Sequence, residues 1–291
     1  MIDIKKELIR TARSSVRLKI GGKADETVGA SRFGGAPDVP EGFEWARYES
    51  GSMLTGEVKK RPLAFLAQFD CEELARFDKD GLLPKTGVLS FFYELDSRRW
   101  GFDPDDKGCA KVYWFEDKGS LRRAEFPRDL GVNAIDFDYR MPALGITMSA
   151  ENSYQGYSDF LLQREKLLEN WEDYEAALKS LGAYSQTDEN TSKLLGWADT
   201  IQGNMTMECE LVSRGYYLGD SEGWDEVTPL DKQEAEQWSA KDWVLLFQLD
   251  TVKSGDFELM FGDGGRIYFY IRRDDLAARN FDDIWLVLQC G

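Results

Sequence analysis

The sequence predicts an α+β fold made of duplicated, mostly antiparallel β-sheet units with a few helices. Apolar, aromatic runs of strand length recur through both halves of the chain, bounded by Gly, Pro and Asp. One long amphipathic segment separates the halves, and the order of motifs before it returns after it. We therefore expect one compact domain over residues 1–291, made of two pseudo-repeats at about 28–150 and 190–291 joined by a helix at 159–181.

The first half opens with a short helix and continues as strands. Ile4, Leu8 and Ile9 have helical spacing, which predicts a helix within residues 3–13. Apolar residues then alternate, which predicts a strand that ends at the glycine pair Gly21-Gly22. The predicted strands of this half are residues 15–20, 61–70, 87–96 and 110–116.

The joining helix is predicted from its spacing. Its large apolar residues recur at alternating steps of four and three, so they share one helical face. These residues are Leu167, Trp171, Tyr174, Leu178 and Leu181. Gly182 follows directly and is expected to end the helix.

The second half repeats motifs of the first. "PLAFLAQFD" returns as "WVLLFQLD" (243–250), with Gln68 in step with Gln248, and "GVLSFFYELDS" returns as "GRIYFYIRRDDL" (265–276). The spacing between matching positions is 161 residues from Ser31 to Ser192 and 180 from Gln68 to Gln248, as one insertion would produce. Apolar strands resemble one another through β-propensity alone, but the matching Gln and Asp positions favour duplication.

Charge restricts the class of partner. The chain has 36 Lys and Arg against 53 Asp and Glu, a net charge of −17. This negative net charge repels nucleic-acid phosphates and anionic membranes, so neither is expected as a partner. Two interpretations remain: a solvated acidic surface without a dedicated role, or an acidic surface that recognises a basic protein.

Residue types exclude several chemistries. The chain has no His, which removes the usual general base and the commonest metal ligand. Its four cysteines are far apart in sequence, so we expect free thiols, no metal and no cofactor. No apolar run has the ~20 residues that a membrane span needs, and the N-terminus has no signal-peptide pattern. These features predict a cytoplasmic protein.

Several ordered blocks resemble the YwqG-like family, a bacterial family of domains of unknown function. They include "SRFGGAPDVPEGFEW", "PLAFLAQFD", "WGFDPDDKGCAKVYWF", "LLGWADTIQGNM" and "FGDGGRIYFYIRRDDLAARNFDDIWLVLQC". The resemblance covers most of the chain and implies an α+β fold with antiparallel sheets built from a duplicated unit; it implies no catalytic residue. The sequence departs from similar members that place His at Ser192 and Tyr-Pro at Trp197-Ala198.

The stretch 31–45 raises the first candidate site. Its glycines and prolines lack the spacing of phosphate-binding loops. One interpretation is a turn-rich linker held to the sheet by its aromatic residues. The other is a ligand-contacting loop that presents Arg32 and the free backbone N–H groups around Gly35, because Arg32 has no obvious partner nearby in sequence.

Other candidate residues lie in turns and strands. The acidic loop 100–108 is expected to be a solvated turn beside Trp100, an aromatic candidate for exposure. Asp263 lies in a glycine-rich hairpin turn. Amides such as Gln202 and Gln248 lie in or near apolar runs, where they need hydrogen-bond partners. Equivalent amides could meet between the repeats, or a small polar ligand could bind there.

Two functions remain. We favour a non-catalytic binding protein whose acidic surface recognises a basic protein, in the manner of immunity proteins that capture toxins. The alternative is an enzyme or a small-polar-ligand binder that uses Arg32, Gln202, Gln248 and Asp263 in a cleft between the repeats. The sequence leans against an enzyme because it has no His, no metal set and no nucleophile motif.

Overall fold

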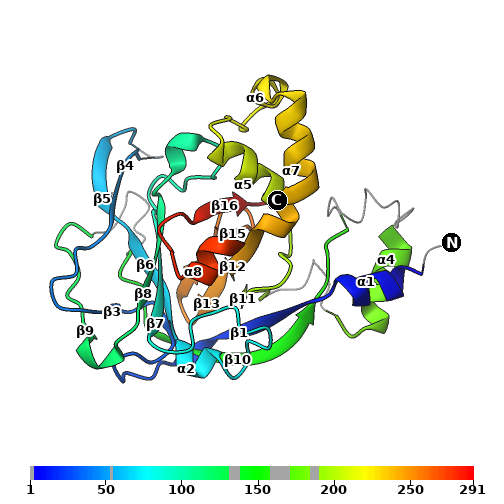
Figure 1. The fold of residues 1–291 in the computed structure, drawn as a ribbon. Helices are drawn as coiled ribbons and strands as arrows, with labels where there is room; N and C mark the ends of the chain where they lie inside the picture. The colour runs from blue at the N-terminus through cyan, green and yellow to red at the C-terminus, as the bar shows by residue number, and fades with distance from the viewer. Residues whose placement is uncertain (1–2, 53–54, 131–137, 158–170, 184–189) are drawn as a thin grey trace.

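The computed structural model describes residues 3–52, 55–130, 138–157, 171–183 and 190–291, and its main feature is one large sheet (Figure 1). The strands of this sheet are β1 (Arg13–Lys23), β2 (Arg32–Phe33), β6 (Ala64–Asp70), β7 (Val88–Tyr93), β8 (Ala110–Phe115), β10 (Leu144–Ser153), β11 (Lys193–Leu194), β12 (Trp243–Leu249), β15 (Arg266–Arg272) and β16 (Trp285–Gln289). Their order is β16-β15-β12-β11-β1-β10-β2-β6-β7-β8, and each neighbouring pair is antiparallel. The predicted α+β class with a mostly antiparallel sheet is confirmed.

A long two-stranded ribbon forms the centre of the sheet. β1 pairs with β10 from Arg13 opposite Ser153 to Lys23 opposite Leu144, with an irregularity after Ile20. β1 therefore continues through Gly21 and Gly22, and the prediction that the strand ends there was wrong. β10 was not predicted, because its residues alternate between small, polar and apolar types.

The two sides of this ribbon have the same strand order. Moving outward from β10 the strands are β2, β6, β7 and β8, and moving outward from β1 they are β11, β12, β15 and β16. The register also agrees, because Arg32 lies opposite Gln68 and Lys193 lies opposite Gln248. The two sides therefore correspond strand by strand.

Aromatic side chains join the two sides into one core. The ring of Phe91 on β7 lies 4.7 Å from that of Phe247 on β12 and 5.2 Å from that of Phe269 on β15. Phe69 on β6 also contacts Phe247. Strand alternation directs these residues to one face, so Gln68 and Gln248 point to the opposite face.

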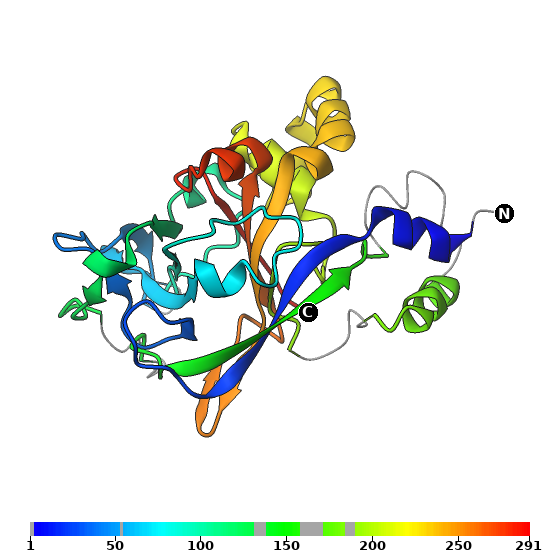
Figure 2. The same cartoon turned by 60° about the horizontal axis from the view of Figure 1, so that its bottom comes forward.

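The helices cover three separate places (Figures 1 and 2). α1 (Ile4–Thr11) packs against α4 (Trp171–Ser180) at one end of the central ribbon. α5 (Met205–Ser213) and α7 (Pro229–Asp242) pack on β12, and α6 (Ser221–Glu226) lies between them in sequence. Short helices α2 (Cys71–Leu74) and α8 (Arg273–Ala278) directly follow β6 and β15. Residues 159–170 of the predicted joining helix lie outside the described residues.

The remaining elements are small. Two-stranded pairs form between β3 (Asp38–Val39) and β9 (Arg122–Arg123), β4 (Arg47–Gly51) and β5 (Val58–Pro62), and β13 (Val252–Ser254) and β14 (Phe257–Leu259). Short 3₁₀ turns η1 (Pro104–Asp106) and η2 (Lys118–Ser120) flank β8. In the described part of the chain, no helix is long and apolar enough to cross a bilayer.

Candidate functional site

A buried polar cluster lies where the chain turns from β2 into β3. We call Arg32, Asp38 and Gln68 the first cluster. Arg32 Nη1 lies 2.9 Å from Asp38 Oδ2, and Gln68 Nε2 donates to the same oxygen at 2.7 Å. The Asp38 backbone N–H donates to Gln68 Oε1 at 2.9 Å. A cation and an amide thus hold one carboxylate inside the protein.

The other half contains the same arrangement. Lys193, Asp199 and Gln248 form the second cluster, in which Lys193 Nζ lies 2.7 Å from Asp199 Oδ2. Gln248 Nε2 donates to this oxygen at 2.9 Å, and its Oε1 accepts from the Asp199 backbone N–H at 2.9 Å. The cation, the amide and the carboxylate therefore keep their roles, with Lys in place of Arg.

Backbone turns of matching geometry bring each aspartate beside its partners. Gly34 and Leu195, which follow β2 and β11, both have φ of 61°, and Gly35 and Gly196 follow with φ of 67° and 82°. A side chain at Gly34 would place its Cβ 2.2 Å from the carbonyl oxygen of Pro142. The first turn therefore requires glycine for space as well as conformation.

Ion pairing keeps both aspartates charged. Burial acts to raise the pKa of Asp38, but hydrogen bonds from Arg32 and Arg123 lower it overall. Burial likewise acts against ionisation of Asp199, and the neighbouring Lys193 ammonium lowers its pKa overall. Burial lowers the pKa of Lys193 itself, and Asp199 opposes that shift.

Three of the predicted site residues lie in the two clusters or in their turns. Arg32 and Gln248 are fully buried in them, and Gly35 lies in the turn of the first cluster. The prediction that Arg32 has no nearby partner was wrong, because the turn folds Asp38 back onto it. The expectation that Gln68 and Gln248 meet was also wrong, because each forms its hydrogen bonds within its own half.

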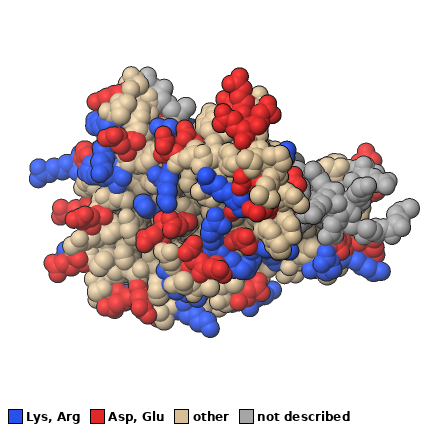
Figure 3. Space-filling view, turned by 45° about the horizontal axis from the view of Figure 1, so that its top comes forward, with Lys and Arg blue, Asp and Glu red and all other residues tan. Residues whose placement is uncertain are grey.

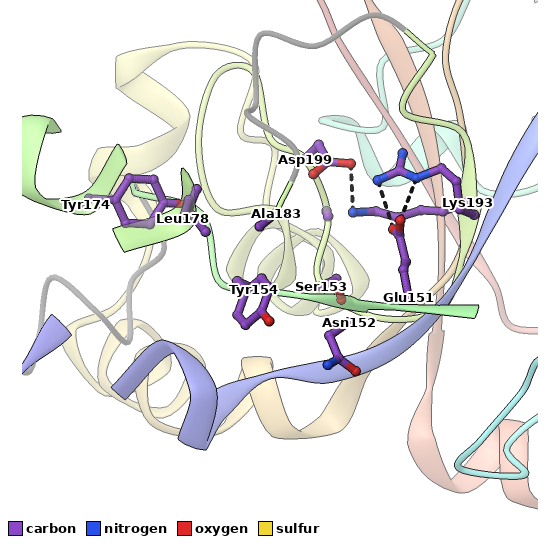
Figure 4. Close-up of a pocket in the computed structure, with 11 residues that line it drawn as sticks. Glu151, Asn152, Ser153, Tyr154, Tyr174, Leu178, Ala183, Lys193 and Asp199 are labelled. Carbon is purple, nitrogen blue, oxygen red and sulfur yellow. Dashed lines mark hydrogen bonds and ion pairs between the residues drawn. The ribbon is translucent and has the colours of Figure 1, made fainter. Parts of the chain in front are cut away.

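The clusters differ at the second oxygen of the aspartate. Asp38 Oδ1 lies 2.6 Å from Arg123 Nε, which comes from β9. Within the described chain, no hydrogen bond reaches Asp199 Oδ1, and this residue lines a small polar cavity. Figure 4 shows Lys193 on one side of Asp199 and Ala183, Leu178 and Tyr174 on the other.

The sequence spanning both clusters matches one family model over residues 31–290, whose description is Domain of unknown function (DUF1963). The chain belongs to the DUF1963 family. The match begins beside Arg32 and includes both clusters, while α1 and β1 precede it. No curated protein matches this chain in sequence.

Ser192 has a structural role in this DUF1963 chain. Its Oγ accepts from the Asp250 backbone N–H at 3.0 Å, and Ser31 Oγ accepts from the Asp70 backbone N–H at 2.9 Å. The serine therefore links the strand pair in the same way in both halves.

A larger cleft lies between the β7–β8 loop and the loop that joins α5 to α6. Its volume is about 450 Å³. Residues from both halves line it: Ser97, Arg99, Trp100, Phe102, Asp103, Asp106, Tyr217 and Gly219. The cleft is thus built at a junction of the two halves of the domain.

Hydrogen bonds to backbone carbonyl oxygens of the β7–β8 loop fix the cleft. The Leu218 N–H donates to the Phe102 carbonyl oxygen at 2.8 Å. Trp285 Nε1 donates to the Gly101 carbonyl oxygen at 2.9 Å, and the Leu288 N–H donates to that of Trp100 at 3.0 Å. The β7–β8 loop is therefore attached to the opposite half at three points.

Asp106 is a buried acid at this cleft. Its Oδ2 accepts from the Gly101 backbone N–H at 2.9 Å, and Arg99 Nη1 lies 3.5 Å from its Oδ1. Burial raises the pKa of Asp106 above its usual value. The prediction of a solvated turn was therefore wrong for Asp106, because the loop folds inward against β16.

The other predicted site residues lie apart from the described linings of the cleft and the cavity, except for Trp100. Trp100 lines the cleft and stacks on Phe102 with ring centroids 6.1 Å apart. Gln202 is exposed and its backbone N–H donates to Gln289 Oε1, while Asp263 lies on an exposed turn. Among the described residues, no cluster of three or more acidic or Cys side chains could hold a metal ion.

Sequence reasoning missed the acidic members of both clusters. One signal could have found them: Arg32 precedes Asp38 by six positions, and Lys193 precedes Asp199 by the same interval. For the cleft, Asp106 and Tyr217 lie more than a hundred positions apart in unrelated patterns, so only the fold brings them together.

Proposed function

We propose that this DUF1963 chain is a bacterial, cytoplasmic, YwqG-like binding protein that recognises a basic protein partner without catalysis. The ordered sequence blocks described above support the YwqG-like assignment. A basic side chain of the partner enters the cleft between the β7–β8 loop and the α5–α6 loop.

The composition of the cleft carries this proposal. Trp100, Phe102 and Tyr217 supply aromatic rings, and Asp103 and Asp106 supply carboxyl groups. Aromatic faces attract Lys ammonium and Arg guanidinium groups, and carboxylates add charge-assisted hydrogen bonds. Tyr217 is 44% exposed, so its ring is open to an incoming group.

Among the described residues that line the cleft, one is a cation, Arg99. This guanidinium lies beside Asp106 and 5.9 Å from the ring centroid of Tyr48, so its charge is already engaged within the protein. Asp103 remains as a second acid at the cleft. The exposed acids Asp105 and Asp220 neighbour the lining residues in sequence.

The wider surface is consistent with a basic partner. The net charge is −17, which accelerates the approach of a basic protein. Figure 3 shows Asp and Glu side chains gathered in several clusters on one face, with Lys and Arg between them. Specificity on such a mixed face requires a defined contact, which the cleft supplies.

A small polar molecule is the second candidate ligand. The cleft volume of about 450 Å³ lies within the range of small-molecule sites, roughly 300–1,000 Å³. A cleft at the junction of the two halves was the alternative predicted from sequence. This candidate keeps the same site and replaces the basic side chain with a free ligand.

Peptide binding tests the proposal. A labelled arginine-rich peptide, with a glutamate-rich peptide as the negative control, is titrated against the wild-type chain at low and at moderate salt. Tyr217→Ala and Asp103→Asn should each weaken binding by about tenfold, since loss of a desolvated cation–π or charged contact costs about 1–2 kcal/mol. Binding should weaken but persist at moderate salt, because short-range contacts inside a cleft are screened less than interactions between exposed charges.

Asp263→Asn is the matched control. It removes the same charge from an exposed turn away from the cleft and should change the dissociation constant less than twofold. Equal weakening by Asp263→Asn and Asp103→Asn would show that only net charge attracts the peptide, which contradicts the proposal. Binding of a free polar ligand with Tyr217→Ala sensitivity, but no peptide binding, would favour the second candidate.

A further inference from the structure

The difference between the two polar clusters points to a second binding site, separate from the cleft and independent of the proposed function. In the first cluster, two cations contact the aspartate: Arg32 at Oδ2 and Arg123 at Oδ1. In the second cluster, the described residues supply one, Lys193 at Oδ2. We propose that Asp199 Oδ1 binds a primary ammonium group of a ligand, at the position that corresponds to Arg123 in the first cluster.

The internal repeat shows that this carboxylate geometry accepts a second cation. Backbone angles and the hydrogen bonds of the amide agree between the clusters, so Asp38 and Asp199 are held in the same way. Asp38 is completely buried, whereas the side chain of Asp199 is 15% exposed. The oxygen that Arg123 covers in one half is thus the accessible one in the other.

Both aspartates have charged neighbours. Around Asp38, Arg32 contacts Oδ2 and Arg123 contacts Oδ1, and Asp25 interacts electrostatically with Arg32. The second cavity is lined by two ion pairs, Lys193 with Asp199 and Arg17 with Glu151, the latter 2.8 Å apart. A ligand ammonium at Asp199 Oδ1 would supply the second direct cation contact that Arg123 makes in the first cluster.

The volume of the cavity limits the size of the ligand group that can bind at Asp199. Its volume is about 20 Å³, which admits roughly one water-sized group. A primary ammonium head has that size, whereas a whole guanidinium is larger. Asn152 and Ser153 of β10 and the following Tyr154 also line the space, although the Asn152 side chain points away from Asp199 (Figure 4).

The side-chain amides report on the two aspartates separately. Gln248 Nε2 donates to Asp199 and Gln68 Nε2 donates to Asp38, so their ¹⁵N–¹H signals form a matched pair in one molecule. Methylammonium is titrated at constant ionic strength, with tetramethylammonium as a cation that has no N–H donor. We expect saturable shifts of the Gln248 signals with methylammonium, no comparable shift of Gln68, and no saturation with tetramethylammonium.

Substitutions test whether the shift of the Gln248 signals arises from binding at Asp199. Asp199→Asn should abolish saturation; because it leaves Lys193 buried without its counter-charge, Ala183→Leu offers a second variant that fills the cavity and keeps every charge. Arg123→Ala should uncover Asp38 Oδ1 and make the Gln68 signals respond as well. Tyr217→Ala in the cleft should leave the Gln248 response unchanged, which separates this site from the proposed function.

The outcomes decide the proposal and the source of the ammonium group. Saturation by methylammonium and by the peptide acetyl-Gly-Lys-Gly-amide identifies a protein side chain as a possible source, and saturation by methylammonium alone identifies a free amine. Either result supports the site. Linear shifts, equal shifts of Gln68 and Gln248, or an unchanged response in Ala183→Leu would overturn it.

Discussion

Gln68 and Gln248 occupy the same position in corresponding strands, and each donates a hydrogen bond to the aspartate of its own half, at 2.7 and 2.9 Å. Each amide also accepts from the backbone N–H of that aspartate. The amide therefore closes the turn that follows β2 or β11 and fixes the carboxylate beside its cation. Both clusters depend on this geometry.

Replacing either amide with leucine should destabilise the protein. Gln68→Leu and Gln248→Leu leave buried partners at Asp38 or Asp199 without hydrogen bonds, which costs about 1–3 kcal/mol in the free energy of unfolding. Urea unfolding measures this change. Gln237→Leu, at an exposed position of α7, is the control and should change stability by less than about 0.5 kcal/mol. Wild-type stability of both buried variants would contradict a structural role.

The sequence predicted the strongest local patterns. β6, β7, β8, β12 and β15 were found because buried strands are apolar runs bounded by turn residues. The helices α5, α6 and α7 were not identified, because α7 in particular exposes polar residues on most of its surface and has no clear apolar stripe. Tertiary packing determines such segments more than periodicity does.

The candidate sites were predicted less well. Arg32, Gly35, Trp100 and Gln248 were singled out from the sequence as candidates. Arg32 and Gln248 are buried members of the clusters, and Gly35 lies in the turn of the first cluster. Composition reveals that an amide or a cation in an apolar run needs a partner. It does not reveal which side chain a turn will bring to it.

Glycine at position 34 should be irreplaceable. Gly34→Ala adds a Cβ that would lie 2.2 Å from the Pro142 carbonyl oxygen, in addition to the unfavourable positive φ. We expect a loss of about 3 kcal/mol or more in the free energy of unfolding. The control Gly22→Ala has a similar φ of 70° with open space around it, so it should lose only about 1–2 kcal/mol. Urea unfolding that gives equal losses would show that conformation alone matters.

Glu208 should make stability depend on pH. Burial raises the pKa of Glu208 to about 7, above the ordinary 4.5. The folded state then binds more protons than the unfolded state between these values, so stability is retained below about pH 4.5 and lost as pH rises through 7. The loss attributable to this group is at most about 3 kcal/mol.

Comparison with Glu208→Gln isolates this effect. The variant removes the titrating proton, so its advantage over wild type in urea unfolding should grow from pH 5 to pH 8. Glu222→Gln, at an exposed position of α6, is the control and should show no such trend. A constant difference between wild type and Glu208→Gln across this range would contradict the raised pKa.

The four cysteines should differ in reactivity. All are free, and Cys71, Cys109 and Cys209 are buried, whereas Cys290 is partly exposed. Burial raises the pKa of Cys71 to about 12 and also raises the pKa of Cys109 and Cys209, which suppresses their thiolates. Iodoacetamide at pH 7.5 should modify Cys290 first, as mass spectrometry of digests would show. A native disulfide, or faster labelling of Cys109 than of Cys290, would contradict this order.

The hydrogen bond from the Leu288 N–H to the Trp100 carbonyl oxygen has a further consequence. β16 is the last strand at one end of the sheet, and such a border exposes backbone groups that can recruit a strand from another molecule. The β7–β8 loop occupies part of that border, and Gly101 packs so tightly there that an added Cβ would lie 1.9 Å from the Leu286 carbonyl oxygen. The segment that builds the cleft therefore also covers backbone groups at this border, so a change that loosened it would expose an edge that favours self-association.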